Sequence, residues 1–436
     1  MNGYSYSYSE FDDILTIKYN KNGDSIWTRK FIGVGQVSDR PNAMTLDKHG
    51  NIYITGGGIS CSLCPQDILT ISYKNNGDLK WVKYFNGKGY GYDVGNDIII
   101  DKNNIIYVGG SATGKGGIIL EYDSIGNQLR TFSSPNFSCN KLLLDSNLNI
   151  FLGFDFYGGV TTGIDIAIAK LDPVGVLNWL RIYHNNSTNN HDYFRSMCLD
   201  NSGNVTVTGV SANAGQQGWD IATIQYSPNG DTSWINRYNT PLTVNSNDES
   251  FDIVSDKYGN VYVTGTSDSG FIARMITIKY SSTGTREWIA FYNNNNPFAW
   301  HSGARILTDT LGSIYVTGRG LGNGTGVDII SIKYSPLTNY KNFSVLIPNE
   351  FKLSQNYPNP FNPKTIINYD LPVSCEISLK VYNSSGKEIM TLVNEDKNAG
   401  SYRVEFNGSN LSSGIYFYTL FADGITISTK KLILLK

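Results

Sequence analysis

The sequence is poor in cysteine, histidine and charge, and each shortage narrows the class of protein. Five cysteines among 436 residues are too few for a disulfide framework, and the four histidines show no metal-ligand spacing. Charged residues make up 17% of the chain, the net charge is −2, and basic clusters are missing. We therefore do not expect a nucleic-acid partner. No run of 18 apolar residues occurs, which argues against a membrane-spanning helix.

Sustained helical periodicity is also missing. Hydrophobic residues make up 40% of the chain, enough to bury large cores, but they fall in short runs rich in Ile, Val, Tyr and Thr. These runs are bounded by Asn, Gly and Asp, the pattern of strands separated by turns. The sequence therefore predicts an all-β protein with almost no helix.

A seven-residue phrase recurs over the first three quarters of the chain. It reads DILTIKY at 13–19 and returns at 67–73, 165–171, 220–226 and 328–334, with degenerate copies at 116–122 and 274–280. The copies end at positions 19, 73, 122, 171, 226, 280 and 334, so the steps are 54, 49, 49, 55, 54 and 54 residues. A fixed period near 50 indicates one supersecondary unit that has been copied.

Each unit contains three further elements in constant order. A tryptophan strand follows the phrase, then a strand leading into Asp-x-x-Gly-Asn, then a β-branched strand ending in Thr-Gly. Four strands per unit predict a β-propeller blade, and residues 1–338 predict a propeller of six or seven blades. The tryptophans recur at one position, where a large ring wedges between blades, so we assign them to the core: Trp27, Trp81, Trp179, Trp234 and Trp288.

The composition changes after the last repeat. Residues 339–352 predict a linker, marked by Pro348 and Asn349, and 353–436 predict a second, small β-sandwich of roughly seven strands. This domain opens with LSQNYPNPFNP at 353–363 and continues with LKVY at 379–382, GIYFY at 414–418 and KKLILLK at 430–436.

These blocks resemble the C-terminal sorting domain of cargo exported by the type IX secretion system. The resemblance implies an Ig-like sandwich, a partnership between residues 353–436 and the type IX machinery, and a location outside the cell or on its outer surface. The first 340 residues resemble, less tightly, the bacterial SBBP β-propeller repeats. Residues 1–20 lack the pattern of a signal peptide and the first unit starts partway through, so we expect the natural protein to extend further at its N-terminus.

No catalytic motif or cofactor signature stands out. The segment 109–115 (GGSATGK) matches the start of a phosphate-binding loop, but Gly116 follows where Ser or Thr belongs and a strand comes next, so we expect no nucleotide site. Cys61 and Cys64 predict an intraloop disulfide or two free thiols in preference to a metal site. The repeated Asp-x-x-Gly-Asn aspartates fit tight turns better than calcium ligands.

The long loops differ in sequence from one repeat to the next, whereas the strands and short turns recur. In a meander, these long loops lie at one end of each blade. Residues there that do not repeat are our candidate ligand-binding positions: Tyr90, Tyr92, Asp93, Tyr157, His191, Trp219, Asp248, Trp300 and His301. The favoured function is a binding scaffold for glycans or other surface polymers. An extracellular hydrolase or lyase with its site at the tunnel mouth and a purely structural surface component are the alternatives.

Overall fold

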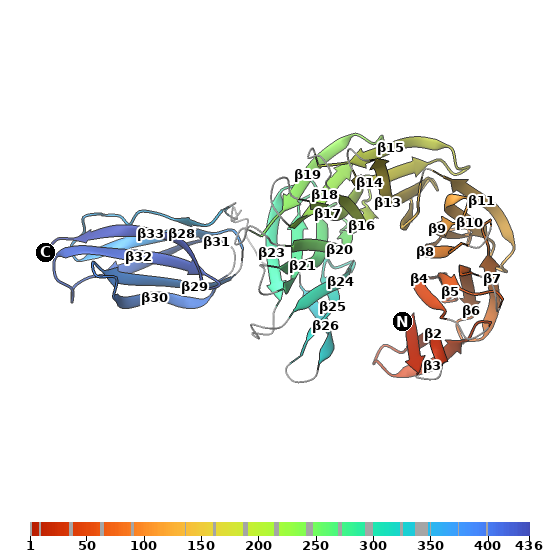
Figure 1. The fold of residues 1–436 in the computed structure, drawn as a ribbon, viewed down its shortest axis with the longest axis horizontal. Helices are drawn as coiled ribbons and strands as arrows, with labels where there is room; N and C mark the ends of the chain where they lie inside the picture. Colours follow the sequence, from red (N-terminus) through yellow and green to blue (C-terminus); the bar gives the residue numbers. More distant parts are fainter. Residues whose placement is uncertain are drawn as a thin grey trace. The chain divides into compact units, whose positions relative to one another are not determined.

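A computed structural model shows an all-β chain whose described residues contain 33 strands and no helix (Figure 1). The structure describes residues 2–7, 10–34, 38–61, 65–88, 91–135, 137–159, 163–185, 191–212, 218–240, 247–268, 273–292, 300–322, 326–335, 348, 350–373, 375–397 and 400–436. They form two compact units, Met1–Ser196 and Met197–Lys436. The predicted fold class is confirmed, whereas the domain boundaries at 338 and 353 stay a prediction.

The first unit is built of antiparallel sheets that each correspond to one repeat. The opening sheet has three strands, β1 (Asn2–Ser7), β2 (Glu10–Tyr19) and β3 (Ser25–Phe31). Three four-stranded blades follow: β4 (Arg40–Leu46), β5 (Ile52–Gly58), β6 (Asp67–Tyr73) and β7 (Leu79–Phe85); β8 (Val94–Ile100), β9 (Ile106–Ala112), β10 (Gly116–Tyr122) and β11 (Gln128–Ser134); β12 (Lys141–Leu144), β13 (Ile150–Gly159), β14 (Gly163–Leu171) and β15 (Leu177–Tyr183).

The chain passes into the second unit within β16 (Asp192–Leu199). The strands that follow are β17 (Val205–Ala212), β18 (Trp219–Tyr226), β19 (Thr232–Tyr238), β20 (Asn247–Ser255), β21 (Val261–Asp268), β22 (Ala273–Tyr280), β23 (Arg286–Tyr292), β24 (His301–Thr308), β25 (Ile314–Leu321) and β26 (Val327–Tyr334). One parallel bridge, Trp219 to Asn247, joins the β16–β19 blade to the β20–β23 blade. The described residues thus form seven repeat sheets, of which the first and the last have three strands.

The Asp-x-x-Gly-Asn segments are tight turns, as their sequence predicts. The Asp47 carboxylate accepts hydrogen bonds from the backbone amides of His49 (2.8 Å) and Asn51 (2.9 Å), and from the Asn51 side chain (2.7 Å). The neighbouring short turn lies at the same end of the blade, because the Asn75 side chain donates to the His49 carbonyl at 3.0 Å. The remaining loops of the blade therefore lie at its opposite end.

Aromatic rings fill the junctions between successive blades. The Trp27 ring lies 6.5 Å from the Tyr73 ring of the next blade, and Trp81 lies 5.9 Å from Tyr122. In the second unit, Trp234 and Tyr280 repeat the pair at 5.8 Å. The same tryptophans cover a turn glycine of the next blade, so the ring takes the space that any Cβ there would need. The predicted wedge role is confirmed for these junctions.

In four blades a buried aspartate ties the link loop to the strand that follows it. The link-loop amide of Gly33 donates to Asp39 at 2.7 Å, Gly87 donates to Asp93, and Asn185 donates to Asp192 at 2.7 Å. Asp248 accepts from the Thr240 amide (2.6 Å) and hydroxyl (2.7 Å). We call Asp39, Asp93, Asp192 and Asp248 the link clasp. His301 occupies the corresponding place before β24, since it pairs with Gly320 as Asp248 pairs with Ser267.

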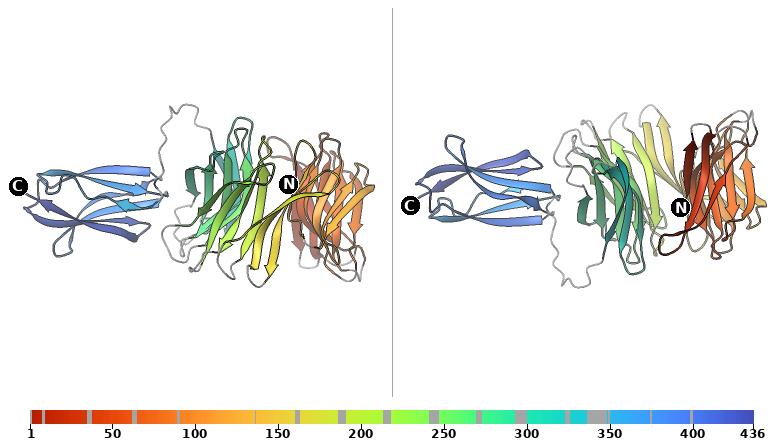
Figure 2. Two further views of the ribbon diagram at one scale, coloured as in Figure 1. Left: turned by 90° about the horizontal axis from the view of Figure 1, so that it is seen from above. Right: turned by 90° about the horizontal axis from the view of Figure 1, so that it is seen from below.

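The C-terminal strands form two sheets with buried side chains on both, and Figure 2 shows them as two layers. One sheet has the order β27 (Lys352–Leu353), β28 (Lys364–Leu371), β31 (Gly400–Asn407); the other has β30 (Glu388–Lys397), β29 (Cys375–Asn383), β32 (Gly414–Ala422), β33 (Ile425–Leu434). The Phe361 and Phe406 rings pack at 5.7 Å. The Tyr418 hydroxyl donates to the Ser354 carbonyl at 2.8 Å, which holds the opening segment to this core.

Replacing Trp81 with alanine is expected to lower the free energy of unfolding by about 3–5 kcal/mol, because the buried ring packs against two blades. Trp234 is only half-buried, so the same change there is expected to cost less. Denaturant titration of the full chain measures both, with Tyr92→Ala as the control. Tyr92 is 80% exposed and its loss is expected to stay within about 0.5 kcal/mol. An equal loss for Tyr92→Ala and Trp81→Ala would contradict the wedge role.

Asp248 makes a pH-dependent contribution to stability. Burial raises its pKa to about 7, well above the value near 3.9 in an unfolded chain. The folded chain therefore binds this proton more tightly, and the resulting stabilisation is complete below about pH 4 and is lost as the pH rises through about 7. At about 1.4 kcal/mol per pKa unit, the loss is at most about 4 kcal/mol.

The Asp248→Asn variant is expected to lack the contribution of Asp248 to the pH dependence of the unfolding free energy between pH 4 and pH 8. Denaturant titrations over that range compare it with the wild type and with Asp231→Asn, a change at an exposed turn position that keeps the wild-type slope. Identical slopes for Asp248→Asn and the wild type would show that Asp248 is ionised throughout.

Candidate functional site

The structure separates the nine predicted binding residues into surface and interior groups. Tyr92 and Tyr157 are exposed (80% and 68%), and His191, Trp219 and Trp300 are half-buried. Asp93, Asp248 and His301 are buried, and Tyr90 lies outside the described residues. The surface group alone is accessible to a large ligand.

The buried residues belong to the link clasp and its equivalent position. Asp93 also accepts from the Thr113 amide at 2.6 Å, so it fastens a hairpin as well as a link loop. His301 packs edge-on against Tyr292 at 5.4 Å, and burial lowers its pKa, which favours the neutral ring. These positions recur in the repeat, so their contacts serve the blade.

Two of the surface candidates, Tyr157 and His191, lie beside each other in the first unit. Tyr157 is the register partner of Ile164 on the neighbouring strand β14, and the Ile164 amide donates to His191 Nδ1 at 3.1 Å. This bond fixes the imidazole. Because Nδ1 accepts, a neutral His191 ring has its hydrogen on Nε2 and is free to present a donor there.

Strand β16 extends the His191 surface with two more side chains at alternate positions. The Tyr193 ring stacks on the His191 ring at 5.8 Å with 25° between the planes, and the Arg195 guanidinium lies 5.8 Å from the centre of the Tyr193 ring. Alternate residues of a strand point to the same face, so these three form a continuous row. We call His191, Tyr193 and Arg195 the stacked row.

Asp155 of β13 supports the stacked row from the neighbouring strand. Its carboxylate accepts from the backbone amide of Phe194 at 2.7 Å, which fixes the segment that holds Tyr193 and Arg195. Burial raises the pKa of Asp155, while the Phe194 bond and the Arg195 charge act in the opposite direction. A carboxyl with these contacts positions the row.

The stacked row offers three kinds of recognition on one strand. Ring faces bind apolar patches, the His191 and Tyr193 heteroatoms exchange hydrogen bonds, and Arg195 binds carboxylate or sulfate oxygens. Exposed Tyr157 adds a further ring at the strand register next to His191.

The second unit has a smaller aromatic–cation pair at a loop end. The Arg319 guanidinium lies 5.6 Å from the centre of the Trp300 ring, and the Leu321 amide donates to the Trp300 carbonyl at 3.1 Å. Trp219 begins β18, where it pairs with Ala212 of β17 and bridges to Asn247 of the next blade. Trp300 is therefore the stronger of the two binding candidates.

Sequence reasoning missed Tyr193, Arg195 and Asp155. The long link was taken to end at 192, so the first residues of β16 were counted as blade. The usable signal was the alternation His-Asp-Tyr-Phe-Arg at 191–195, in which every second residue is aromatic or cationic. Asp155 gives no such signal, because its role depends on a backbone amide of another strand.

The other sequence motifs have structural roles. The phosphate-loop-like segment forms the hairpin between β9 and β10, in which Gly114 has a φ of 70° and no helix follows. Cys61 is disulfide-bonded, in agreement with the predicted preference over metal, whereas Cys139, Cys198 and Cys375 are free and buried. Within the described ranges, no three His, Cys, Asp or Glu side chains are grouped to hold a metal ion. No helix in the same part of the chain is suited to cross a membrane.

Two family models match segments of the chain, one near each end. The family described as "Secretion system C-terminal sorting domain" matches residues 355–435, and the SBBP family described as "Beta-propeller repeat" matches residues 26–60. A search of curated proteins finds no match.

Several solved structures are similar at low identity. A protein of unknown function from Bacteroides caccae shares 12% identity over 68% of this chain and 96% of its own, with a TM-score of 0.38. The Dos1 propeller shares 9% over 89% and 81% (TM-score 0.42), and the polysaccharide lyase Uly1 shares 9% over 84% and 90% (TM-score 0.42). Scores below 0.5 give no argument about function. The chain thus contains an SBBP β-propeller repeat and ends in a type IX C-terminal sorting domain, which supports secretion or a cell-surface location.

Proposed function

We propose that this exported propeller is a binding scaffold that holds acidic polysaccharides on its stacked row. The observation that supports the proposal is the geometry of His191, Tyr193 and Arg195, with Tyr157 beside them. Two stacked rings and a guanidinium on alternate strand positions match the apolar face and the carboxylate of a uronic acid residue. The sorting domain supplies the route to the outside of the cell, where such polymers occur.

The disulfide at Cys61 supports an extracytoplasmic location. Disulfides form and persist in oxidising compartments, and they are rare in reducing ones. The three free cysteines are buried in the interior, where oxidation is slow. Cysteine use is therefore compatible with export.

Tyr193→Ala and Arg195→Ala are each expected to weaken binding of uronate-containing polysaccharides by about tenfold, since a central aromatic or arginine contact commonly contributes more than 1 kcal/mol. Affinity electrophoresis and titration calorimetry of the full chain against acidic and neutral polysaccharides measure the loss. Arg195→Ala should also reduce the preference for acidic over neutral chains, because it removes the cation.

Tyr258→Ala is the matched control for these variants. Tyr258 is 70% exposed and has a cation at its ring, with Lys257 Nζ at 5.0 Å, but it lies in a short Asp-x-x-Gly turn. This variant should bind as the wild type does. Wild-type affinity in Tyr193→Ala would contradict the proposal. Retention of the polymer without product supports a scaffold, whereas chain cleavage that His191→Ala abolishes would favour the hydrolase or lyase alternative.

Deleting residues 353–436 from the naturally exported protein is expected to leave a folded propeller in the periplasm of a host with type IX machinery. The reason is that the matched sorting domain lies within those residues and forms two sheets separate from the blades. Immunoblots of periplasm, cell surface and medium measure the distribution, and fusion of 353–436 to an unrelated exported protein should redirect that protein outward. Unchanged export of the truncated chain would contradict the assignment.

A further inference from the structure

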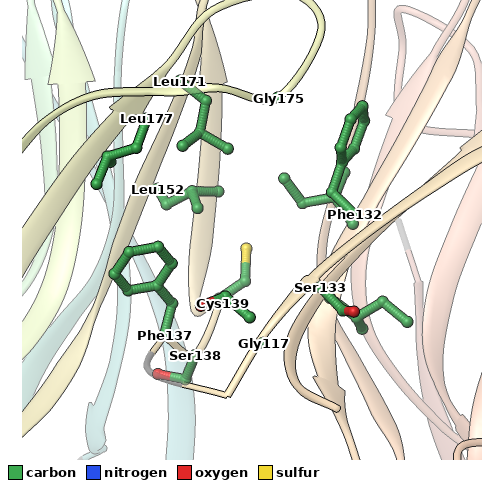
Figure 3. Close-up of a pocket in the computed structure, with 13 residues that line it drawn as sticks. Gly117, Phe132, Ser133, Phe137, Ser138, Cys139, Leu152, Leu171, Gly175 and Leu177 are labelled. Carbon is green, nitrogen blue, oxygen red and sulfur yellow. The ribbon is translucent and has the colours of Figure 1, made fainter.

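A cavity of about 100 Å³ lies at one junction in the first unit, between the β8–β11 blade and the β12–β15 blade (Figure 3). Strand β10, the end of β11, the segment after it and the facing strands β13 to β15 supply its walls. The side chains that define it are Ile119, Phe132, Phe137, Cys139, Leu152 and Leu171.

The cavity exists because this junction lacks both aromatic residues of the repeat. In register, Lys18 pairs with Trp27 on the first sheet, whereas Glu121 pairs with Arg130 here. Arg130 therefore stands where the repeat has tryptophan. The partner position, a tyrosine in six of the seven copies, is Leu171.

Arg130 does not fill the space that the missing indole leaves. Its Nε donates to the buried Glu121 carboxylate at 2.7 Å, on the neighbouring strand of its own blade, and 45% of the arginine side chain is exposed. Glu121 and Arg130 thus occupy the two positions that Lys18 and Trp27 occupy in the first sheet. The paired guanidinium lies 5.3 Å from the centre of the Phe132 ring, and Arg130 is not among the residues that line the cavity.

Phe132 replaces only part of the wedge. Its ring covers Gly175, since a Cβ on that glycine would lie 2.3 Å from the ring, just as Trp27 covers Gly77 and Trp81 covers Gly126. Phe132 lies two positions further along its strand than Arg130. Space therefore remains between Phe132 and the aliphatic side chains Leu152 and Leu171, as Figure 3 shows.

The walls of the cavity are suited to an uncharged ring. Among the described residues that line it there is no charged side chain, and their polar atoms are serine hydroxyls, backbone groups and the Cys139 thiol. Burial raises the pKa of Cys139 well above its ordinary value, so the sulfur stays protonated and offers a polarizable contact. An apolar protein cavity of about 150 Å³ is known to stay dry and to bind benzene.

We propose that this junction is a binding site for a small, uncharged aromatic molecule. The repeat itself indicates the chemistry: at four junctions the same interface contains two aromatic rings, with centroids 5.5–6.5 Å apart. A free ligand ring of the size of benzene or indole would take the place of the aromatic side chain that the chain itself provides at the other junctions. The site is independent of the stacked row and of the polysaccharide proposal.

The test measures the melting temperature of the full chain with benzene, indole, and benzoate as the charged control. Benzene and indole at millimolar concentration are expected to raise the Tm by at least about 1 °C, and benzoate is not, because binding to the folded form alone stabilises it. Leu171→Phe fills the cavity, so it is expected to raise the Tm by itself and to abolish the response to benzene. Leu129→Phe adds the same ring at a half-exposed position outside the cavity and should keep the response.

A crystal soaked in bromobenzene gives a readout that does not depend on any variant folding. A bromine anomalous peak between Phe132, Leu152 and Leu171 is expected. A Tm response to benzene that persists in a folded Leu171→Phe chain would overturn the proposal. So would a wild-type chain that shows neither a Tm response nor a bromine peak in the cavity.

Discussion

The propeller depends on the contact between a tryptophan of one blade and the aromatic ring and turn glycine of the next. A four-stranded meander leaves both faces of its sheet uncovered, so a blade is stable only where its neighbour covers it. Trp27, Trp81 and Trp234 provide that cover together with Tyr73, Tyr122 and Tyr280. The Asp-x-x-Gly turns and the link clasp set the two ends of each blade so that the rings meet. The cavity beside Leu171 shows what the interface becomes when both rings are lost.

The sequence repeat made most of the fold predictable. Part of the candidate site was assigned wrongly, because two aspartates that recur were counted as residues particular to one loop. The phrase at 13–19 and its copies predicted the strands, the short turns and the wedge, because each feature depends on residues close in sequence. The link clasp was not recognised, although Asp39, Asp93, Asp192 and Asp248 recur at steps of 54, 99 and 56 residues, where 99 is two periods. Asp93 and Asp248 were instead counted as individual. The stacked row was not predicted as a unit, because it depends on contacts between strands, such as the hydrogen bond from the Ile164 amide to His191.

The two ends of a blade differ in how much their sequence varies among the repeats of this chain. One end of a blade is fixed by short turns that bond to each other, as Asn75 does to His49. The other end presents Tyr157, His191 and the residues that follow it on β16. A ligand site can thus change with little effect on the blade, whereas the clasp residues beneath it cannot. The C-terminal sorting domain lies outside both constraints, because its strands form two sheets that contain no repeat.

The turn glycines differ in which substitutions their surroundings allow. Gly23 and Gly77 both have φ near +90°, a conformation that asparagine also tolerates. A Cβ on Gly23 would meet nothing within 4 Å, whereas a Cβ on Gly77 would come within 2.9 Å of the Trp27 ring. Asparagine at Gly23 would therefore meet only the backbone strain of this φ, whereas at Gly77 it would also clash with the Trp27 ring. As copies of the repeat diverge, a turn that receives a tryptophan can lose its glycine only after that tryptophan has gone.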